Sequence, residues 1–353
     1  MAKIYEIYGF APHEMTMALM EAADVSAMLP KGGRVALKPN LVTVSPPEEG
    51  ATTHPGVLSG AIEYLRGHGV QAIEVIEGSW VGANTRWAMA AAGYDKVCEK
   101  YGVPFYDLKQ DTSTPVKTPF GPIAVCDRAR TADFLINLPV LKGHCQTVMT
   151  CALKNCKGCI PDREKRRFHA AGLTKPIAVL ACALKPRLTI VDSICGDLDF
   201  EEGGNPVQTG RMYLGTDPVQ LDAYGCHLMG LDVADVPYIS LAEQWGGGST
   251  AIEPGDLVAL NDPSQAGTYP APSGKAARLT QNVQEKDACS ACYAALVRAL
   301  HSVGGSRRPI AIGQGWRGKS FDGLGIGRCC DCAARQVKGC PPSPEEILRE
   351  LNR

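Results

Sequence analysis

Six cysteines in the last quarter of the chain have the residue type and the spacing of a metal-cluster site. They are Cys289, Cys292, Cys329, Cys330, Cys332 and Cys340. The first two form a CxxC pair at the start of a helical pattern, where the helix dipole would lower the pKa of a thiol. The last lies in a Gly-Cys-Pro-Pro segment, and Cys followed by Pro recurs in iron–sulfur ligation. This pattern predicts one 4Fe-4S cluster, bound by Cys289, Cys292, Cys329 and Cys340.

Zinc is the structural alternative, because four thiolates also form a closed tetrahedral zinc site. Two features favour the cluster. The spacing between the third and fourth ligands is irregular, and nearby glycines would let backbone amides approach the cluster sulfides. The third ligand can be Cys329, Cys330 or Cys332, and the spacing does not choose among them.

The segment 137–169 contains cations, amides and glycines at high density. If residues 144–155 form one helix, an imidazole, a thiol and an amide share one of its faces. No acidic residue lies between positions 142 and 159 to neutralise the cations. The block therefore predicts a pocket for a small anionic ligand, and the alternative is a helix end with solvated lysines. The residues expected to act catalytically on the ligand are Lys142, His144, Lys154 and His169. Those expected to help bind it are Asn155 and Lys165.

Asp192 is a further candidate for ligand binding, because it lies near the end of a buried apolar strand, 188–194. The carboxyl ends of parallel strands are where α/β proteins place ligands. With the acidic residues that follow, Asp192 could also hold a divalent cation through oxygen ligands. These residues are Asp197, Asp199, Glu201 and Glu202. The alternative is a solvated acidic loop.

A second set of four cysteines lies within the central block, namely Cys145, Cys151, Cys156 and Cys159. On one helix these side chains could not all converge unless the helix broke at Gly158. We therefore favour buried or reactive thiols over a second cluster.

Several short motifs, in their order along the chain, resemble the family catalogued as domain of unknown function 362. They are Lys38-Pro39-Asn40, Thr53-His54-Pro55, Lys142-Gly143-His144, Leu153-Lys154-Asn155 before Gly158-Cys159, Lys165 and His169, Val191-Asp192-Ser193, Gly203, and Thr216-Asp217-Pro218-Val219 with Asp222. The resemblance covers roughly residues 33–232. Its most specific parts are Lys142–His169 and Asp217–Asp222.

The resemblance implies that Lys38 and Asn40 also belong to the ligand-binding residues. Many members of this family carry iron–sulfur motifs, which usually look like the CxxCxxCxxxC run of ferredoxins. This chain has no such run. The C-terminal cysteines would take its place, so the resemblance does not imply a carrier with two clusters. The family has no settled activity.

Strand-like and helix-like segments alternate along most of the chain. Helical patterns at 12–28, 54–67 and 85–101 alternate with strand patterns at 35–37, 72–76, 134–140 and 188–194. This order predicts an α/β fold with a mostly parallel sheet, helices on both faces, and a small C-terminal cysteine-rich cluster-binding module. The expected parts are an N-terminal α/β part (1–110), a central α/β part with the Lys/His/Cys-rich block (111–260), and the module (276–353).

Charge and composition exclude several classes of protein. The 353 residues carry 36 basic and 37 acidic side chains, which gives no basic excess for nucleic acid. Charged residues interrupt every long apolar stretch, so no membrane partner is expected. The 15 cysteines are an odd number, and the first residues lack the basic leader and apolar core of a secretory signal. We therefore expect a cytoplasmic protein whose cysteines are not a disulfide scaffold.

The function predicted from these features is that of an iron–sulfur redox protein, an oxidoreductase acting on or near the small anionic ligand. One alternative is a non-redox enzyme with a structural or Lewis-acid cluster. Another is an accessory protein that delivers electrons or a cofactor to a redox partner protein. No GxGxxG, GxxxxGK[ST] or GxSxG motif occurs in the context that it requires, which weakens nicotinamide-dependent, nucleotide-hydrolysing and esterase functions.

Overall fold

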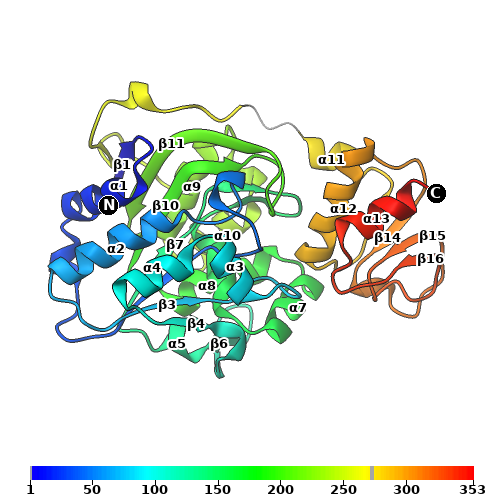
Figure 1. Cartoon of the computed structure of the whole chain (residues 1–353), viewed down its shortest axis with the longest axis horizontal. Helices are drawn as coiled ribbons and strands as arrows, with labels where there is room; N and C mark the ends of the chain where they lie inside the picture. The colour runs from blue at the N-terminus through cyan, green and yellow to red at the C-terminus, as the bar shows by residue number, and fades with distance from the viewer. Residues whose placement is uncertain (1, 271–273) are drawn as a thin grey trace.

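The computed structural model describes residues 2–270 and 274–353, with a large α/β part and a smaller C-terminal part (Figure 1). The large part is built on an eight-stranded sheet of order β12-β1-β11-β10-β7-β2-β3-β4. Its strands are β1 (Ile4–Tyr8), β2 (Val35–Pro39), β3 (Ile73–Glu77), β4 (Phe105–Asp107), β7 (Phe134–Leu138), β10 (Leu188–Asp197), β11 (Pro206–Gly215) and β12 (Leu257–Ala259). Among these described strands only β11 runs antiparallel to its neighbours, so the predicted mostly parallel sheet is confirmed.

Helices cover both faces of this sheet, as predicted, because successive residues of a buried strand point to opposite sides. On one face, Val35 and Leu37 share a core with α1 (Pro12–Ala22), α2 (Pro55–Gly67), α3 (Thr85–Ala91) and α4 (Tyr94–Tyr101). On the other face, Ala36 and Val191 share a core with α6 (Ala152–Asn155), α8 (Thr174–Leu184), α9 (Pro218–Leu228) and α10 (Pro237–Gln244). The strands of residues 1–110 belong to the same sheet as β7, β10, β11 and β12 of residues 111–260.

Three smaller elements complete the large part. They are the hairpin of β5 (Ser113–Val116) and β6 (Ile123–Cys126), the short helix α5 (Asp127–Arg130), and α7 (Asp162–Ala170). The helix expected at 85–101 is divided into α3 and α4 at Gly93, whose φ of 74° is a conformation that glycine adopts readily. Of the helices in the described part of the chain, none is long and apolar enough to span a bilayer.

The direction in which the sheet grows reverses at β2. The chain adds β3 and β4 on one side of β2, then returns to place β7 and β10 on the other side. Ligands of open α/β sheets bind outside the carboxyl ends of the strands at such a reversal. Three buried polar residues, Lys38, Glu77 and Asn137, lie at or near the carboxyl ends of β2, β3 and β7. This edge of the sheet is therefore the place to look for a site.

The prediction of a helix over residues 144–155 is wrong. The segment instead forms a hairpin of β8 (Lys142–His144) and β9 (Val148–Thr150), and α6 begins only at Ala152. The β-branched residue Thr150, at the end of β9, favours extended backbone. Asp222 then fixes where the helix starts, since its carboxylate accepts a 2.6 Å hydrogen bond from the backbone N–H of Ala152.

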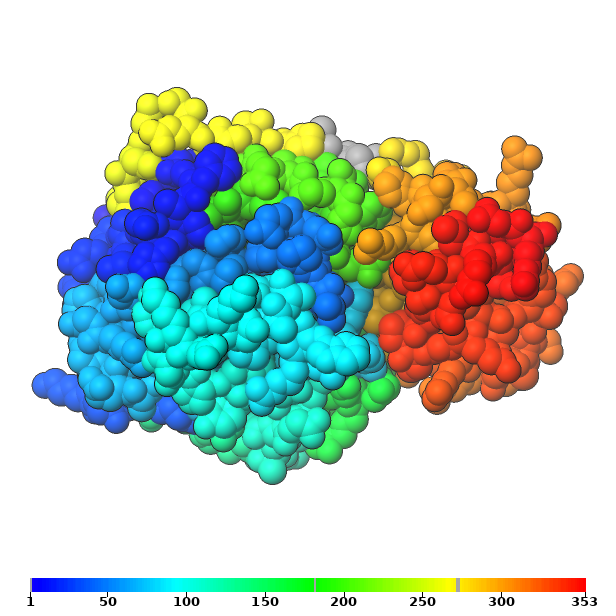
Figure 2. All heavy atoms as spheres, in the orientation of Figure 1, coloured from blue at the N-terminus to red at the C-terminus, as the bar shows by residue number. Residues whose placement is uncertain are grey.

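The C-terminal part has its own four-stranded sheet, β13-β14-β15-β16, in which all neighbouring strands are parallel. Its elements are α11 (Lys275–Leu279), β13 (Val283–Glu285), α12 (Ser290–Val303), β14 (Ile310–Ile312), β15 (Phe321–Ile326), β16 (Ala333–Val337) and α13 (Pro344–Leu351). Leu296, Leu300 and Ile326 form part of a separate hydrophobic core. This part forms a lobe at one end of the molecule (Figure 2).

We predict that Gly143→Ala destabilises the fold. An added Cβ at Gly143 would overlap the carbonyl of Leu198, which lies in the loop that follows β10. Relieving this overlap should lower the free energy of unfolding by about 1–3 kcal/mol, as other overpacked sites do. Thermal unfolding monitored by circular dichroism measures the effect. Gly67→Ala is the matched control, because an added Cβ there meets no atom within 4 Å, and an equal loss in both variants would contradict the prediction.

Candidate functional site

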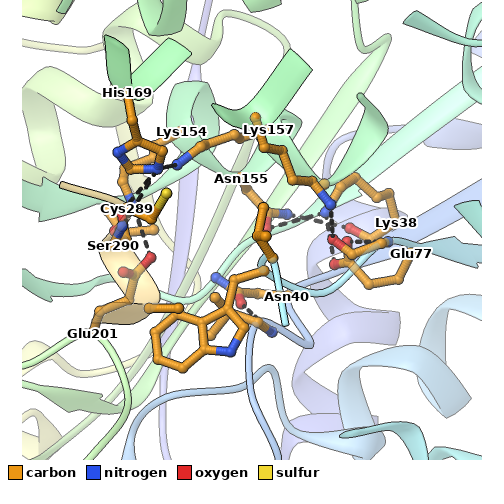
Figure 3. Close-up of a pocket in the computed structure, with 18 residues that line it drawn as sticks. Lys38, Asn40, Glu77, Lys154, Asn155, Lys157, His169, Glu201, Cys289 and Ser290 are labelled. Carbon is orange, nitrogen blue, oxygen red and sulfur yellow. Dashed lines mark hydrogen bonds and ion pairs between the residues drawn. The ribbon is translucent and has the colours of Figure 1, made fainter. Parts of the chain in front are cut away.

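A cavity of about 50 Å³ lies at the carboxyl edge of the large sheet, between the large part and the C-terminal part (Figure 3). Its wall is built from the ends of β2 and β3, from α6 and the turn after it, from α7, and from the start of α12. The residues that the argument below uses are Lys38, Glu77, Lys154, Asn155, Lys157, Lys165, His169, Glu201, Cys289 and Ser290. Residues from the central block and one of the predicted cluster cysteines therefore line the same cavity.

At one end of the cavity, Lys38 is held in a buried ion pair with Glu77. The Lys38 Nζ donates hydrogen bonds to Glu77 Oε2 at 2.8 Å and to Asn155 Oδ1 at 3.2 Å. Asn155 is fixed in turn by Asn137, to whose Oδ1 its Nδ2 donates at 2.8 Å. The charge of Lys38 is thus neutralised, and these side chains form a rigid polar wall.

At the other end, Glu201 is surrounded by three residues of the central block. Its carboxylate lies 2.9 Å from Lys154 Nζ and 2.8 Å from His144 Nε2, and its backbone carbonyl accepts a 2.6 Å hydrogen bond from Lys142 Nζ. Burial alone would raise the pKa of Glu201, but His144 and Lys154 hold it well below its usual range. The expectation that these cations lack acidic partners is wrong, because Glu201 is contributed by a loop far along the chain.

The imidazole of His144 is neutral. Its Nδ1 accepts hydrogen bonds from the backbone N–H groups of Gln146 and Thr147, which leaves the proton on Nε2, facing Glu201. Burial lowers the pKa of His144 to about 4 and that of Lys142 to about 8. His144 and Lys142 do not line the cavity; they stand behind Glu201 and hold it in place.

Lys157 differs from the other lysines of the cavity, because the described residues offer its ammonium no direct carboxylate partner. Its Nζ donates a 2.8 Å hydrogen bond to His169 Nε2, which also lies 3.4 Å from the backbone N of Ser290. Burial of the ammonium group, followed by repulsion from Lys154, lowers the pKa of Lys157 to about 7. Burial also lowers the pKa of His169 well below its usual value. Lys157 is therefore the cationic position at which an incoming anion would gain most.

The other predicted ligand-binding residues have different surroundings. Lys165 donates to the backbone carbonyls of Gly78 and Ser79 at 2.9 and 2.7 Å, so it fixes the loop after β3. Asn40 lines the cavity, but Asp192 does not. Asp192 accepts hydrogen bonds from the backbone N–H groups of His54 and Ile194, and it lines a separate cavity. Both of its carboxylate oxygens are used in ordering the backbone.

The structure gathers four of the six C-terminal cysteines at the carboxyl edge of the small sheet. Cys289 follows β13, Cys329 follows β15 and Cys340 follows β16, while Cys292 lies in the first turn of α12. The thiols of Cys289 and Cys292 are each in electrostatic range of those of Cys329 and Cys340. Burial raises the pKa of both Cys289 and Cys292, so the expected lowering by the helix dipole is wrong.

The two remaining C-terminal cysteines are placed differently. Cys330 is buried beneath the small sheet, where its Sγ lies 3.3 Å from the carbonyl oxygen of Ala311. Cys332 is exposed. Of these three cysteines, Cys329 is the one whose charge acts on both Cys289 and Cys292, whereas Cys330 acts on Cys292. Over the described residues, no three His, Cys, Asp or Glu side chains are arranged to hold a single metal ion.

The cysteines of the central block lie mainly in the core. Cys151, Cys156 and Cys159 are fully buried in the hydrophobic core of the large part. The Cys151 Sγ lies 3.4 Å from the hydroxyl of Tyr213, and Cys156 Sγ lies 3.6 Å from the carbonyl oxygen of Ala152. Cys145 lines a different cavity.

Three charged residues of the cavity were not among the predicted site residues: Glu77, Lys157 and Glu201. Glu77 is the last residue of a strand that is buried along its whole length, and a carboxylate at that position is a signal for a functional site. Lys157 lies inside the cation-rich block. Only the three-dimensional structure shows that, among the described residues, no carboxylate pairs with it. Glu201 belongs to an acidic loop whose solvated alternative was preferred, and only the fold brings it against Lys154.

The fold and the cavity define an α/β protein with a polar pocket at the carboxyl edge of its sheet, beside a cysteine-bearing module. The family model described as domain of unknown function (DUF362) matches residues 35–227, which is more than half of the chain. The chain therefore belongs to this family, and the predicted resemblance is confirmed. The matched residues end before the C-terminal part, so the four gathered cysteines lie outside them.

Two other proteins are similar to the chain. The thylakoid-associated protein sll1697 of Synechocystis sp. is 28% identical over 233 residues, which cover 63% of this chain and 71% of that protein. The lactate racemase apoprotein from Thermoanaerobacterium thermosaccharolyticum is 13% identical, with a TM-score of 0.45. That match covers 64% of this chain, and it spans 56% of the racemase chain.

We predict that Glu201→Gln is strongly destabilising. The substitution keeps the shape of the side chain but leaves the buried Lys154 without a carboxylate. Breaking a buried pair by removing one partner lowers the free energy of unfolding by about 3–5 kcal/mol, which urea denaturation can measure. Glu253→Gln, at an exposed position, serves as the control. Similar stability of the two variants would show that Glu201 does not hold the wall together.

Proposed function

We propose that the protein is an iron–sulfur redox protein that binds a small anionic ligand in the cavity between its two parts. The observation that carries this proposal is the position of Cys289. This residue belongs to the group of four neighbouring cysteines, and it also lines the cavity next to Ser290, which contacts His169. A cluster bound there would lie directly beside the ligand, as electron transfer between them requires.

The cysteine group fits a 4Fe-4S cluster in its donor set and in the backbone around it. Cys289, Cys292, Cys329 and Cys340 supply four thiols from three loops. Gly327 has a φ of 82°, a conformation that glycine adopts readily, and it places the backbone within van der Waals range of Cys292 Sγ. Because burial raises the thiol pKa of Cys289 and Cys292, metal binding must displace protons. When bound, the cluster supplies or accepts single electrons.

The ligand is held mainly through Lys157 in this proposal. Lys38 and Lys154 are already neutralised by Glu77 and Glu201, so their charges contribute little to anion binding. A carboxylate or phosphate oxygen on Lys157 would gain a charge-assisted hydrogen bond worth about 1.5–3 kcal/mol. Such an anion would favour the ammonium form of Lys157, which would hold a proton at Nζ beside the ligand. Reduction of the ligand could then be accompanied by transfer of that proton.

We predict that anaerobically purified protein is brown and that Cys289→Ala or Cys340→Ala removes most of its iron. Both residues are proposed ligands, whereas Cys332→Ala is the matched control because Cys332 is exposed and is not a proposed ligand. Iron and sulfide analysis with electron paramagnetic resonance measures the result. Colourless protein with one tightly bound zinc per chain would contradict the proposal and establish the zinc alternative.

We predict that Lys157→Met abolishes binding of acetate and inorganic phosphate, measured by isothermal titration calorimetry, without changing the iron content. Lys175→Met, at an exposed position on α8, is the control and should bind like the unaltered protein.

The pH dependence gives a second check on Lys157. Its pKa is lowered to about 7, so the ammonium form predominates below pH 7 and is lost as the pH rises. Affinity for these anions should therefore fall above pH 7, by up to about tenfold per unit. Equal affinity at pH 6 and pH 9 would contradict the role of Lys157.

A further inference from the structure

The charge of this chain is unevenly divided between its two parts. Residues 274–353 carry 13 Lys and Arg against 7 Asp and Glu, whereas residues 1–273 carry 23 against 30. The overall net charge of -1 therefore conceals a basic C-terminal part joined to an acidic large part. Such a separation creates a directed electrostatic field, which acts on association with charged partners and has no role in the fold itself.

Some of the basic residues of the C-terminal part are used within it. Glu350 forms an ion pair with Arg335 at 2.6 Å, which joins β16 to α13, and a second ion pair with Arg353. Four others, which we call the basic rim, lie in the loops that carry or flank the cysteine group. They are Arg317, Lys319, Arg328 and Lys338, and all are exposed.

The basic rim surrounds the side of the cysteine group that faces solvent. Arg328 directly precedes Cys329, and Lys338 lies two residues before the exposed Cys340. The guanidinium of Arg317 lies within electrostatic range of Cys329 and Asp331. Over the described residues, none of the four rim side chains forms an ion pair with a carboxylate. Asp331 is an exposed acidic residue in the same loop as Arg328. Its carboxylate accepts a 2.9 Å hydrogen bond from the backbone N–H of Gly318.

We propose that the basic rim is the docking surface for a small acidic one-electron carrier protein. The inference rests on the proposed cluster, and it identifies where that cluster exchanges electrons with the rest of the cell. The cysteine group meets the ligand cavity at Cys289, while Cys340 is exposed, two residues after Lys338 of the basic rim, and borders Gly82 of the large part. An acidic carrier would be attracted by the rim and repelled by the acidic large part. Its orientation would therefore be fixed before contact.

The electron transfer that this docking permits is balanced without a further reactant. One electron leaves the reduced carrier, which is oxidised by one unit, and the cluster is reduced by one unit. No bond is formed or broken in this step. A second transfer supplies the second electron when the ligand in the cavity undergoes a two-electron reduction.

The experiment compares two charge-reversed double variants of the iron-loaded protein. Arg328→Glu with Lys338→Glu inverts the rim at the carboxyl edge of the small sheet. Arg307→Glu with Arg308→Glu makes the same change in charge at exposed positions just before β14, at the opposite edge of that sheet. The probe is a plant-type ferredoxin, which is an acidic one-electron carrier. Its affinity is measured by isothermal titration calorimetry, and the rate of cluster reduction is measured by stopped-flow absorbance.

The rim variant should bind the ferredoxin at least about tenfold more weakly at low salt and should be reduced more slowly to a similar degree. Its salt dependence should also be shallower than that of the unaltered protein. The control variant should stay within about twofold of the unaltered protein, and both variants should retain their iron. Equal affinities for the rim and control variants, or tighter binding of duplex DNA than of ferredoxin, would overturn this inference alone. Absence of iron from the unaltered protein would overturn the proposed function and this inference with it.

Discussion

Burying several cations in one wall of a protein requires counter-charges, and the arrangement of this cavity follows from where those counter-charges lie. Glu201 neutralises Lys154 and lies 2.8 Å from the protonated Nε2 of His144, while its backbone carbonyl accepts a hydrogen bond from Lys142. Glu77 does the same for Lys38. An isolated buried ammonium group would lose its proton or move into solvent. The two glutamates are therefore required for charged lysines to line this cavity.

The same constraint sorts the lysines into two groups. Those with a carboxylate or several carbonyl partners position the backbone of the cavity wall. Lys165 belongs to this group, because it joins α7 to the loop after β3 through two carbonyls. Lys157 has a neutral imidazole as its partner, and its charge is correspondingly easy to lose. The residue that is least well neutralised is the one that an anion would stabilise most.

The carboxyl edges of the two sheets, whose strands are mostly parallel in one and all parallel in the other, meet at the cavity. The edge of the large sheet supplies Lys38, Glu77 and the loops that follow β7 and β10, and the edge of the small sheet supplies the cysteine group. Parallel strands deliver all their following loops to the same side, which explains how residues from distant parts of the sequence meet. Ser290 and His169, which are 121 positions apart and whose side chains lie 3.4 Å from each other, mark the junction.

Periodicity and composition alone were sufficient to predict the α/β class, the parallel sheet and the helices on both of its faces, because apolar alternation encodes burial directly. The motif order was likewise sufficient to place the chain in its family. The sequence failed in residues 144–155, where a hairpin replaced the expected helix because Asp222, about seventy positions away, caps the start of α6. It also left open which of Cys329, Cys330 and Cys332 is nearest the CxxC pair, since the three lie within four positions in the turn between β15 and β16, where no periodicity fixes the direction of a side chain. The pairing of Glu201 with the central block is a contact between segments about fifty residues apart. Such contacts are set by how the sheet brings its loops together, and no local pattern of residues records them.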